Sequence, residues 1–120
     1  MSAPRDDGVF LGHIRDAIAR IESYVDRLTE RDFLDTPVVQ DAVIRQLQVI
    51  GEATKRLSGE YRAKNPGIPW ADIAGMRDKL VHDYVTIDLY AVWDTATRDL
   101  DKLKAHLNEQ GEAGTGSTSA

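Results

Sequence analysis

The sequence predicts an all-α fold, an up-and-down bundle of four main helices. Apolar residues recur at spacings of three and four over several long stretches, which is the pattern of a helix with one buried face. No stretch shows the strict alternation of a half-buried strand. At 120 residues the chain is expected to form one domain, residues 1–110, followed by a disordered tail of Gly, Ser, Thr and Ala at residues 111–120.

The first helix is predicted from a regular apolar stripe. Residues 1–5 are expected to be a loose end, and Asp6 or Asp7 can cap the helix by accepting hydrogen bonds from its first amide groups. Thr29 is expected to cap a short turn that ends before Pro37. The apolar positions on the stripe are Leu11, Ile14, Ile18, Ile21, Val25 and Leu28.

The second helix is expected to begin at Pro37 with Thr36 as its cap and to run to about Ser58. Gly59 would then leave the helix in a left-handed conformation. A helix that is apolar over much of its circumference usually has neighbours on two sides, and a second copy of the chain is one candidate neighbour. Its apolar and small positions are Val39, Ala42, Val43, Leu47, Val49, Ile50, Ala53 and Leu57.

Two further helices complete the predicted bundle. Residues 61–69 are expected to form a connector because proline and glycine interrupt them, and Trp70 begins the third helix. That helix is expected to end or bend near His82, and Asp88 can cap the fourth. The stripe of the fourth helix is Leu89, Trp93, Ala96, Leu100, Leu103 and Leu107.

The composition excludes several classes of function. Fifteen Lys and Arg against 20 Asp and Glu give a net charge of −5, which argues against gripping long duplexes through bulk charge. The absence of cysteine excludes disulfides, thiolate zinc sites and cysteine nucleophiles. His13, His82 and His106 lack metal-ligand spacing, so no metal site is expected. No apolar run approaches the ~20 residues of a membrane span, so a cytoplasmic protein without membrane contact is expected.

Residues 76–84 concentrate the candidate chemistry. Arg77 carries a planar donor fork suited to phosphate, His82 can exchange protons near neutral pH, and Tyr84 adds a hydroxyl. At about 100° per residue, Arg77 and Tyr84 lie almost on one line of a helix, whereas His82 is rotated by about 140° from Arg77. One straight helix therefore cannot easily aim all three at one small target. We expect both that the helix ends or bends near His82 and that a second copy of the chain completes the site.

These residues resemble the R-x4-H-x-Y signature of HEPN domains, and the surrounding sequence resembles the HepT-like toxin family. Genes of that family usually lie beside a gene for a minimal nucleotidyltransferase (MNT) antitoxin. The resemblance covers roughly residues 9–107. A bare R-x4-H-x-Y would be a weak motif, but the other matching stretches occur in the family's order, which makes the match specific. These stretches are residues 40–45, 50–53, 68–70, 75–77, 88–89 and 92–93.

The resemblance implies a HEPN-type bundle that forms a homodimer and acts as a metal-independent endoribonuclease toxin, without a cofactor. Arg77 and His82 would cut RNA in a cleft between two copies, and the cognate nucleotidyltransferase would neutralise the toxin by attaching AMP to Tyr84. One residue departs from the family, because Asp78 follows the arginine where asparagine is frequent. This anion lies beside the proposed phosphate contact, but it is also four residues before His82 and could orient its imidazole.

Metal-free RNA cleavage needs a base for the 2′-hydroxyl proton, an acid for the departing 5′-oxygen and a cation for the charge on phosphorus. One histidine per chain supplies one proton-transfer group. A dimer supplies two histidines and two arginines. The hypothesis is therefore that His82 acts as base or acid, that Arg77 stabilises the transition state, and that the products end in a 2′,3′-cyclic phosphate.

Each residue also has an ordinary explanation. Arg77 can be a surface group, His82 a helix-end residue, and Tyr84 a core residue with its hydroxyl at the rim. Arg45 and Glu52, seven apart, could form a buried pair that supports the dimer or could line the cleft. The rival functions are a non-catalytic nucleotide- or partner-binding subunit of a nucleotidyltransferase complex and a purely structural bundle. The residues assigned only structural roles are His13, His106, Trp70 and Trp93.

Overall fold

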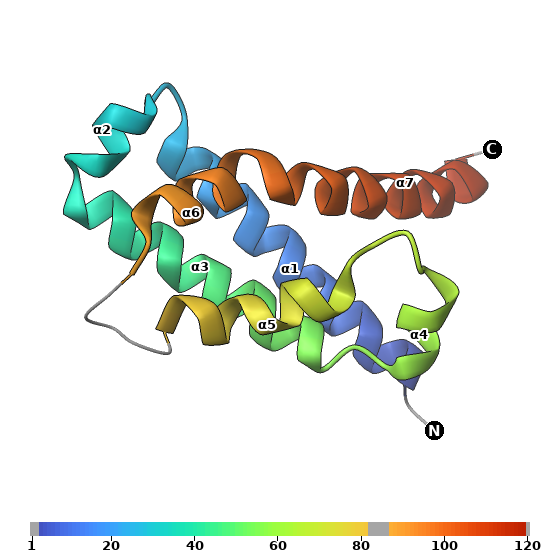
Figure 1. Cartoon of the computed structure of the whole chain (residues 1–120). Helices are drawn as coiled ribbons and strands as arrows, with labels where there is room; N and C mark the ends of the chain where they lie inside the picture. Colours follow the sequence, from blue (N-terminus) through green and yellow to red (C-terminus); the bar gives the residue numbers. More distant parts are fainter. Residues whose placement is uncertain (1–2, 82–86, 120) are drawn as a thin grey trace.

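Four main helices build the bundle in the computed structural model, which describes residues 3–81 and 87–119, with side chains at 6–76 and 87–109. No strand occurs in these ranges. Successive main helices run in alternating directions, which confirms the predicted up-and-down bundle (Figure 1). The main helices are α1 (Ala3–Val25), α3 (Pro37–Lys55), α5 (Trp70–Val81) and a last one formed by α6 (Leu89–Asp94), η1 (Thr95–Asp99) and α7 (Leu100–Ser119). The short helices α2 (Glu30–Leu34) and α4 (Gly59–Lys64) lie between them.

Helix α3 is the centre of the packing. It lies against α1 and also against α5, and α2 and α6 contact it as well. Val43, Leu47 and Ile50 of α3 are 0% exposed. The wide apolar surface predicted for this helix is therefore covered by helices of the same chain. The second copy that the sequence offered as a neighbour is not needed to explain it.

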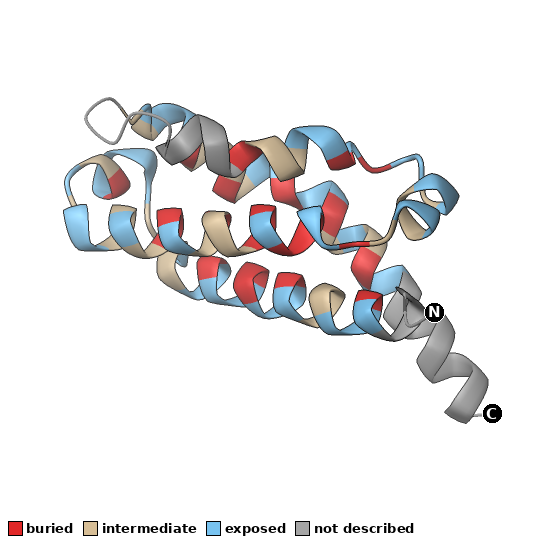
Figure 2. Ribbon diagram, turned by 90° about the horizontal axis from the view of Figure 1, so that it is seen from below, coloured by how far each residue is buried: buried red, intermediate tan, exposed pale blue. Residues whose placement is uncertain are grey.

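The core is a continuous cluster of aliphatic side chains with Phe33 and Trp70 among them. Figure 2 shows the buried positions along the helices on the sides that face one another. Burial of each such side chain stabilises the fold by about 1.5–3 kcal/mol. The stripe predicted for α1 is confirmed at Ile14, Ile18 and Ile21, which are at most 4% exposed. Leu28 lies beyond the end of that helix.

Both ends of α1 differ from the prediction. The helix begins at Ala3, so Asp6 and Asp7 lie within it and are not its cap. Asp7 is instead buried, and its carboxylate accepts hydrogen bonds from the backbone N–H and the hydroxyl of Ser58, both at 2.7 Å. After Val25 the chain turns through Arg27, whose φ of 66° is the left-handed conformation that a helix cannot continue.

Two predicted caps are confirmed. The Thr29 hydroxyl accepts from the N–H of Asp32 at 3.1 Å, and the Asp32 carboxylate accepts from the N–H of Thr29 at 3.0 Å, which is a capping box for α2. Asp88 caps α6 by accepting from the N–H of Ala91 at 3.1 Å. Thr36 stands at the cap position of α3, but its hydroxyl donates to the carbonyl oxygen of Asp32 and makes no cap bond.

The end of α3 was predicted too late. The helix ends at Lys55, and Gly59 is the first residue of α4 without a positive φ. The physical reason is Ser58, whose hydroxyl accepts from the N–H of Tyr61 at 3.0 Å and so begins a new helix. Part of the stretch 61–69, predicted to be a connector, is therefore helical.

The fourth main helix was predicted as one regular helix but contains a π-helical segment, η1. A π turn adds a residue, and the buried residues Val92, Ala96 and Leu100 accordingly follow one another at steps of four. Val92 is 0% exposed, whereas Leu89 and Trp93 of the predicted stripe pack against the core only partly buried.

The last buried position of α7 among the described side chains is Leu107. The helix bounds continue to Ser119, through the stretch 111–119 that the composition assigns to a disordered tail. Since no packing contact of these residues is described, the predicted disorder in solution stays a prediction.

Candidate functional site

The predicted catalytic stretch begins on α5. Arg77 and Asp78 belong to this helix, but their side chains are outside the described set. His82 and Tyr84 fall within residues 82–86 and lie outside the described residues. The relative geometry of the three motif side chains, and the predicted helix end near His82, therefore stay predictions.

The helix that carries Arg77 is anchored in the core. At its start, Trp70 is 7% exposed and its Nε1–H donates to the carbonyl oxygen of Asn65 at 2.8 Å. Toward its end, Met76 is 8% exposed and directly precedes Arg77. Because α5 also lies along α3, the part of the helix that leads into Arg77 is fixed in the core.

The helix that follows the motif is anchored as well. Asp88 caps α6, Val92 is fully buried, and the Trp93 ring lies 5.3 Å from the Phe33 ring. Trp70 and Trp93 are thus core anchors, as predicted from the sequence. The motif is flanked on both sides by helices that the core fixes.

Arg45 and Glu52 line a groove between α1 and α3. Both residues are exposed, so they form no buried pair within a single chain. The groove has a volume of about 530 Å³. It is lined by Phe10, His13, Arg45, Gln48, Val49, Glu52, Ala53 and Arg56.

Sequence reasoning missed Phe10, His13 and Arg56 as members of this groove. The Arg56 guanidinium lies 5.9 Å from the centre of the Phe10 ring, and the Phe10 and His13 rings meet edge to face at 5.8 Å. A signal was present in the sequence, because Arg45 and Glu52 on α3 and Arg56 at its C-cap follow at steps of seven and four and so share one helical face. The α1 residues of the groove could not be predicted, because the sequence does not show which face of α1 packs against α3.

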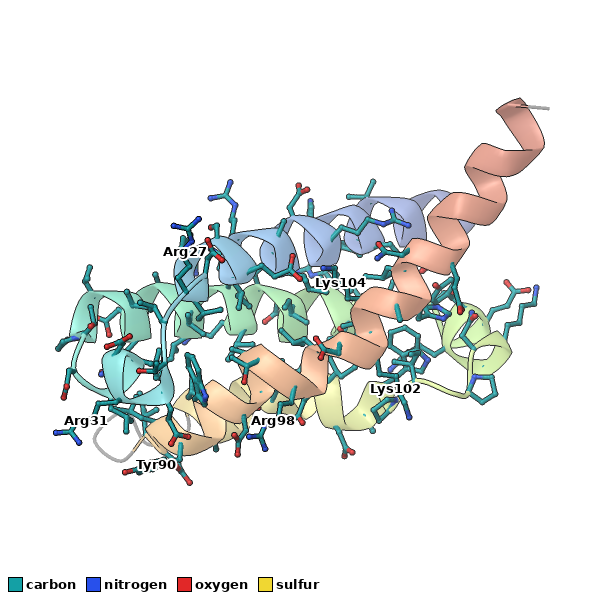
Figure 3. The ribbon with its side chains drawn as sticks, turned by 90° about the horizontal axis from the view of Figure 1, so that it is seen from above. Arg27, Arg31, Tyr90, Arg98, Lys102 and Lys104 are labelled. Atoms are coloured by element: carbon teal, nitrogen blue, oxygen red, sulfur yellow. The ribbon has the colours of Figure 1, made fainter. Side chains whose placement is uncertain are left out.

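A second cavity, of about 540 Å³, lies between α5 and the last helix. Met76, next to Arg77, lines it together with Arg98 and Lys102, which Figure 3 shows on η1 and α7. Asp72 and Asp99 lie in the same lining, so its charges balance. This cavity offers no excess of either charge to a ligand.

His106 has a structural environment, as expected. Its Nε2 lies 3.0 Å from the Tyr61 hydroxyl in a hydrogen bond, and its ring meets that of Trp70 edge to face at 6.0 Å. Burial raises the pKa of Tyr61 above its ordinary value of 10.0, Arg15 opposes the rise and Asp7 adds to it. The cluster joins α4, α5 and α7.

Charge also links α7 to α1. The Lys104 ammonium donates to the Glu22 carboxylate, and this hydrogen bond raises the pKa of Lys104 (Figure 3). The pair is exposed, so its effect on stability is small.

Among the described residues, no three His, Cys, Asp or Glu side chains are grouped to hold a metal ion. In the same part of the chain, no helix is long and apolar enough to cross a membrane.

Comparison with known proteins places the candidate stretch inside a family. The family described as "Ribonuclease HepT-like" matches residues 14–109, a range that includes Arg77, His82 and Tyr84. A relative named "Probable ribonuclease HepT", from Thermococcus cleftensis, is 40% identical over 83% of this chain and 91% of its own length. One named "Putative RNase", from Caldanaerobacter subterraneus subsp. tengcongensis, is 36% identical over 91% of this chain and 95% of its own length.

A longer relative from Methanocaldococcus jannaschii is named "Gamma-glutamylcyclotransferase and putative RNase". It is 42% identical over 86% of this chain, but the match spans only 46% of that relative. No solved structure matches the chain significantly. The family match covers most of the chain, and two relatives match over nearly their whole length. The chain therefore belongs to the HepT-like ribonuclease family.

Proposed function

We propose that this chain is a metal-independent endoribonuclease toxin that cuts RNA with Arg77 and His82. The observation that carries the proposal is the family match over residues 14–109, because it includes the complete arginine, histidine and tyrosine motif. The anchoring of α5 and α6 supports it, since a catalytic group must be held in place by its scaffold.

The proposed reaction is an internal transesterification. The 2′-oxygen attacks the adjacent phosphorus while a neutral His82 takes its proton, and the bond from phosphorus to the 5′-oxygen breaks as a protonated His82 gives that oxygen a proton. The Arg77 guanidinium stabilises the charge that gathers on the phosphoryl oxygens. The products are a 2′,3′-cyclic phosphate and a free 5′-hydroxyl.

This assignment needs two histidines, and each chain carries one in the motif. We therefore propose that two copies of the chain face each other at the motif and form a homodimer with one cleft. Each proton-transfer group typically contributes about 10²- to 10⁴-fold to the rate. Removal of either member of the motif should then nearly abolish cleavage.

Control of the toxin is proposed to act at Tyr84. A cognate MNT-type nucleotidyltransferase would attach AMP to the Tyr84 oxygen, with release of pyrophosphate from ATP. A nucleotide there would place an anion near Arg77 and compete with the RNA phosphate. Neutralisation should then leave an added mass of AMP on wild type and none on Tyr84→Phe; covalent modification of that variant at the motif would overturn this step.

The test of the central proposal is cleavage of a mixed RNA pool by purified protein in excess EDTA. Wild type is expected to produce cyclic-phosphate ends, whereas Arg77→Ala and His82→Ala of matched thermal stability are expected to be silent. A wild type as inert as both variants, while unmodified by mass, would remove the nuclease proposal. Asp78, an anion next to Arg77, would then favour the non-catalytic binding subunit.

A further inference from the structure

The groove between α1 and α3 is a cationic surface on an acidic protein. Its lining contains Arg45 and Arg56 against one acidic residue, Glu52, whereas the whole chain has 20 acidic and 15 basic residues. Three other cavities among the described residues differ: two have balanced charges and one is acidic. Because an anion is repelled by the average surface of this chain, a groove of opposite sign is where an anionic ligand can approach.

The position of one cation is fixed before any ligand binds. The Arg56 guanidinium lies 5.9 Å from the centre of the Phe10 ring, an attractive contact between a cation and an aromatic face. The His13 ring, on the next turn of α1, meets the Phe10 ring edge to face. An exposed arginine that is already oriented loses less conformational freedom when it binds phosphate, because its planar donor fork is pre-set.

The rest of the lining is suited to a nucleotide more than to a simple anion. Val49 and Ala53 provide an apolar floor, and Gln48 can both donate and accept hydrogen bonds. Glu52 can only accept, which suits a 2′-hydroxyl or a base amino group and does not suit a phosphate. Guanidinium planes and aromatic rings are also the surfaces on which unpaired bases stack.

We propose that this groove binds a single-stranded segment of the RNA substrate, with phosphates at Arg45 and Arg56 and a base against the Phe10 and Arg56 pair. The inference rests on the proposed function for the identity of the ligand. Arg45 on α3 and Arg56 at its C-cap are eleven residues apart, about 16 Å along the helix axis, so they are expected to contact different phosphates of an extended strand. The described lining comes from α1, α3 and the C-cap of α3, with no described residue of α5, so the groove is proposed as a binding surface for RNA in addition to the motif.

The test measures binding separately from cleavage. A fluorescent single-stranded RNA is titrated with His82→Ala protein, which cannot cut it, over a range of salt concentrations. In that background, Arg45→Gln with Arg56→Gln is expected to weaken binding by about tenfold or more. The slope of log affinity against log salt should fall by about 0.7 for each lost phosphate contact on a single strand.

Arg27→Gln with Arg31→Gln is the matched control. It removes the same two positive charges from side chains that are 92% and 86% exposed, that pair with Asp26 at 3.9 Å and Asp35 at 3.5 Å, and that do not line the groove (Figure 3). Binding and salt slope of this variant should equal those of the His82→Ala parent. Equal losses in the control and the groove variant would mean that only net charge matters, and they would overturn the inference.

The remaining outcomes separate this inference from the proposed function. In the active background, the groove variant should raise KM while kcat changes little. Unchanged binding and unchanged KM would overturn the groove while RNA cleavage stands. A changed molecular mass of the groove variant in solution would identify the groove as a contact between copies and also overturn it. RNA binding that depends on the groove in a protein that never cleaves RNA would support the groove and remove the nuclease.

Discussion

Tyr61 shows how single residues join helices that are far apart in the sequence. Its hydroxyl is hydrogen-bonded to His106 on α7, and its backbone N–H donates to Ser58, which also donates to the buried carboxylate of Asp7 on α1. These contacts cross 45 and 51 residues of sequence. Each hydrogen bond of this kind contributes on the order of 1 kcal/mol, and leaving a buried partner unsatisfied costs more.

The raised pKa of Tyr61 predicts a loss of stability at alkaline pH. Burial favours the neutral phenol in the folded chain, so its contribution is fully present below the unfolded pKa of about 10. As pH rises above that value, the unfolded chain loses the proton first, and the contribution is lost as pH passes the folded pKa. Tyr61→Phe removes both the proton and the hydrogen bond.

The expected result is that wild type exceeds Tyr61→Phe in unfolding free energy at about pH 8 and that this difference shrinks toward about pH 11. Urea denaturation followed by circular dichroism measures it. Tyr24→Phe, at another half-buried tyrosine, shows what loss of a hydroxyl does on α1. A wild-type advantage that stays constant with pH would contradict the assignment of the raised pKa to Tyr61.

At the scale of elements, local chemistry predicted helix starts better than helix ends. Thr29, Pro37, Trp70 and Asp88 each mark a start that the structure confirms, because a cap or a proline acts within a few residues. The end of α3 depends on Ser58, which serves both the cap of α4 and the distant Asp7. The end of α3 is therefore determined partly by the tertiary contact between Ser58 and Asp7, which the residues next to Ser58 in the sequence do not predict.

The π-helical segment is another feature that the spacing of apolar residues could not predict. A stripe at steps of three and four fits a regular helix, and the extra residue in η1 is visible only when Val92 and Leu100 are both seen to be buried. Prediction of the candidate site had a similar limit. The arginine, histidine and tyrosine motif could be recognised in the sequence, whereas predicting the groove required knowledge of which faces of α1 and α3 pack together.

The cap of α6 makes a prediction at this scale. Asp88→Ala should lower the unfolding free energy by about 1 kcal/mol, because the N–H of Ala91 loses its acceptor, whereas Asp88→Asn should stay within a few tenths since asparagine caps equally well. Chemical denaturation measures both variants. If the alanine and asparagine variants are equally stable, the side chain of Asp88 does not stabilise the start of α6.

For the whole molecule, the single chain already covers its own core. The helix on which a second copy was expected to pack, α3, has α1 and α5 as neighbours, so association is not required to bury its apolar surface. The proposed dimer therefore rests on the chemistry, which needs two proton-transfer groups where the motif of one chain supplies one. It leads to a quantitative expectation for mixtures of wild-type and His82→Ala chains.

Wild type and His82→Ala, mixed in equal amounts and allowed to exchange subunits, should combine at random. If the cleft needs His82 from both copies, only dimers of two wild-type chains cut RNA, and the activity falls to about one quarter of that of an all-wild-type sample at the same total concentration. If each chain acts by itself, about one half remains. Wild type mixed with Arg27→Gln should keep full activity, because that residue lies at the end of α1 and is no part of the motif. A value of one half in exchanged samples would place the complete catalytic site within one chain and would require a second proton-transfer group there other than His82.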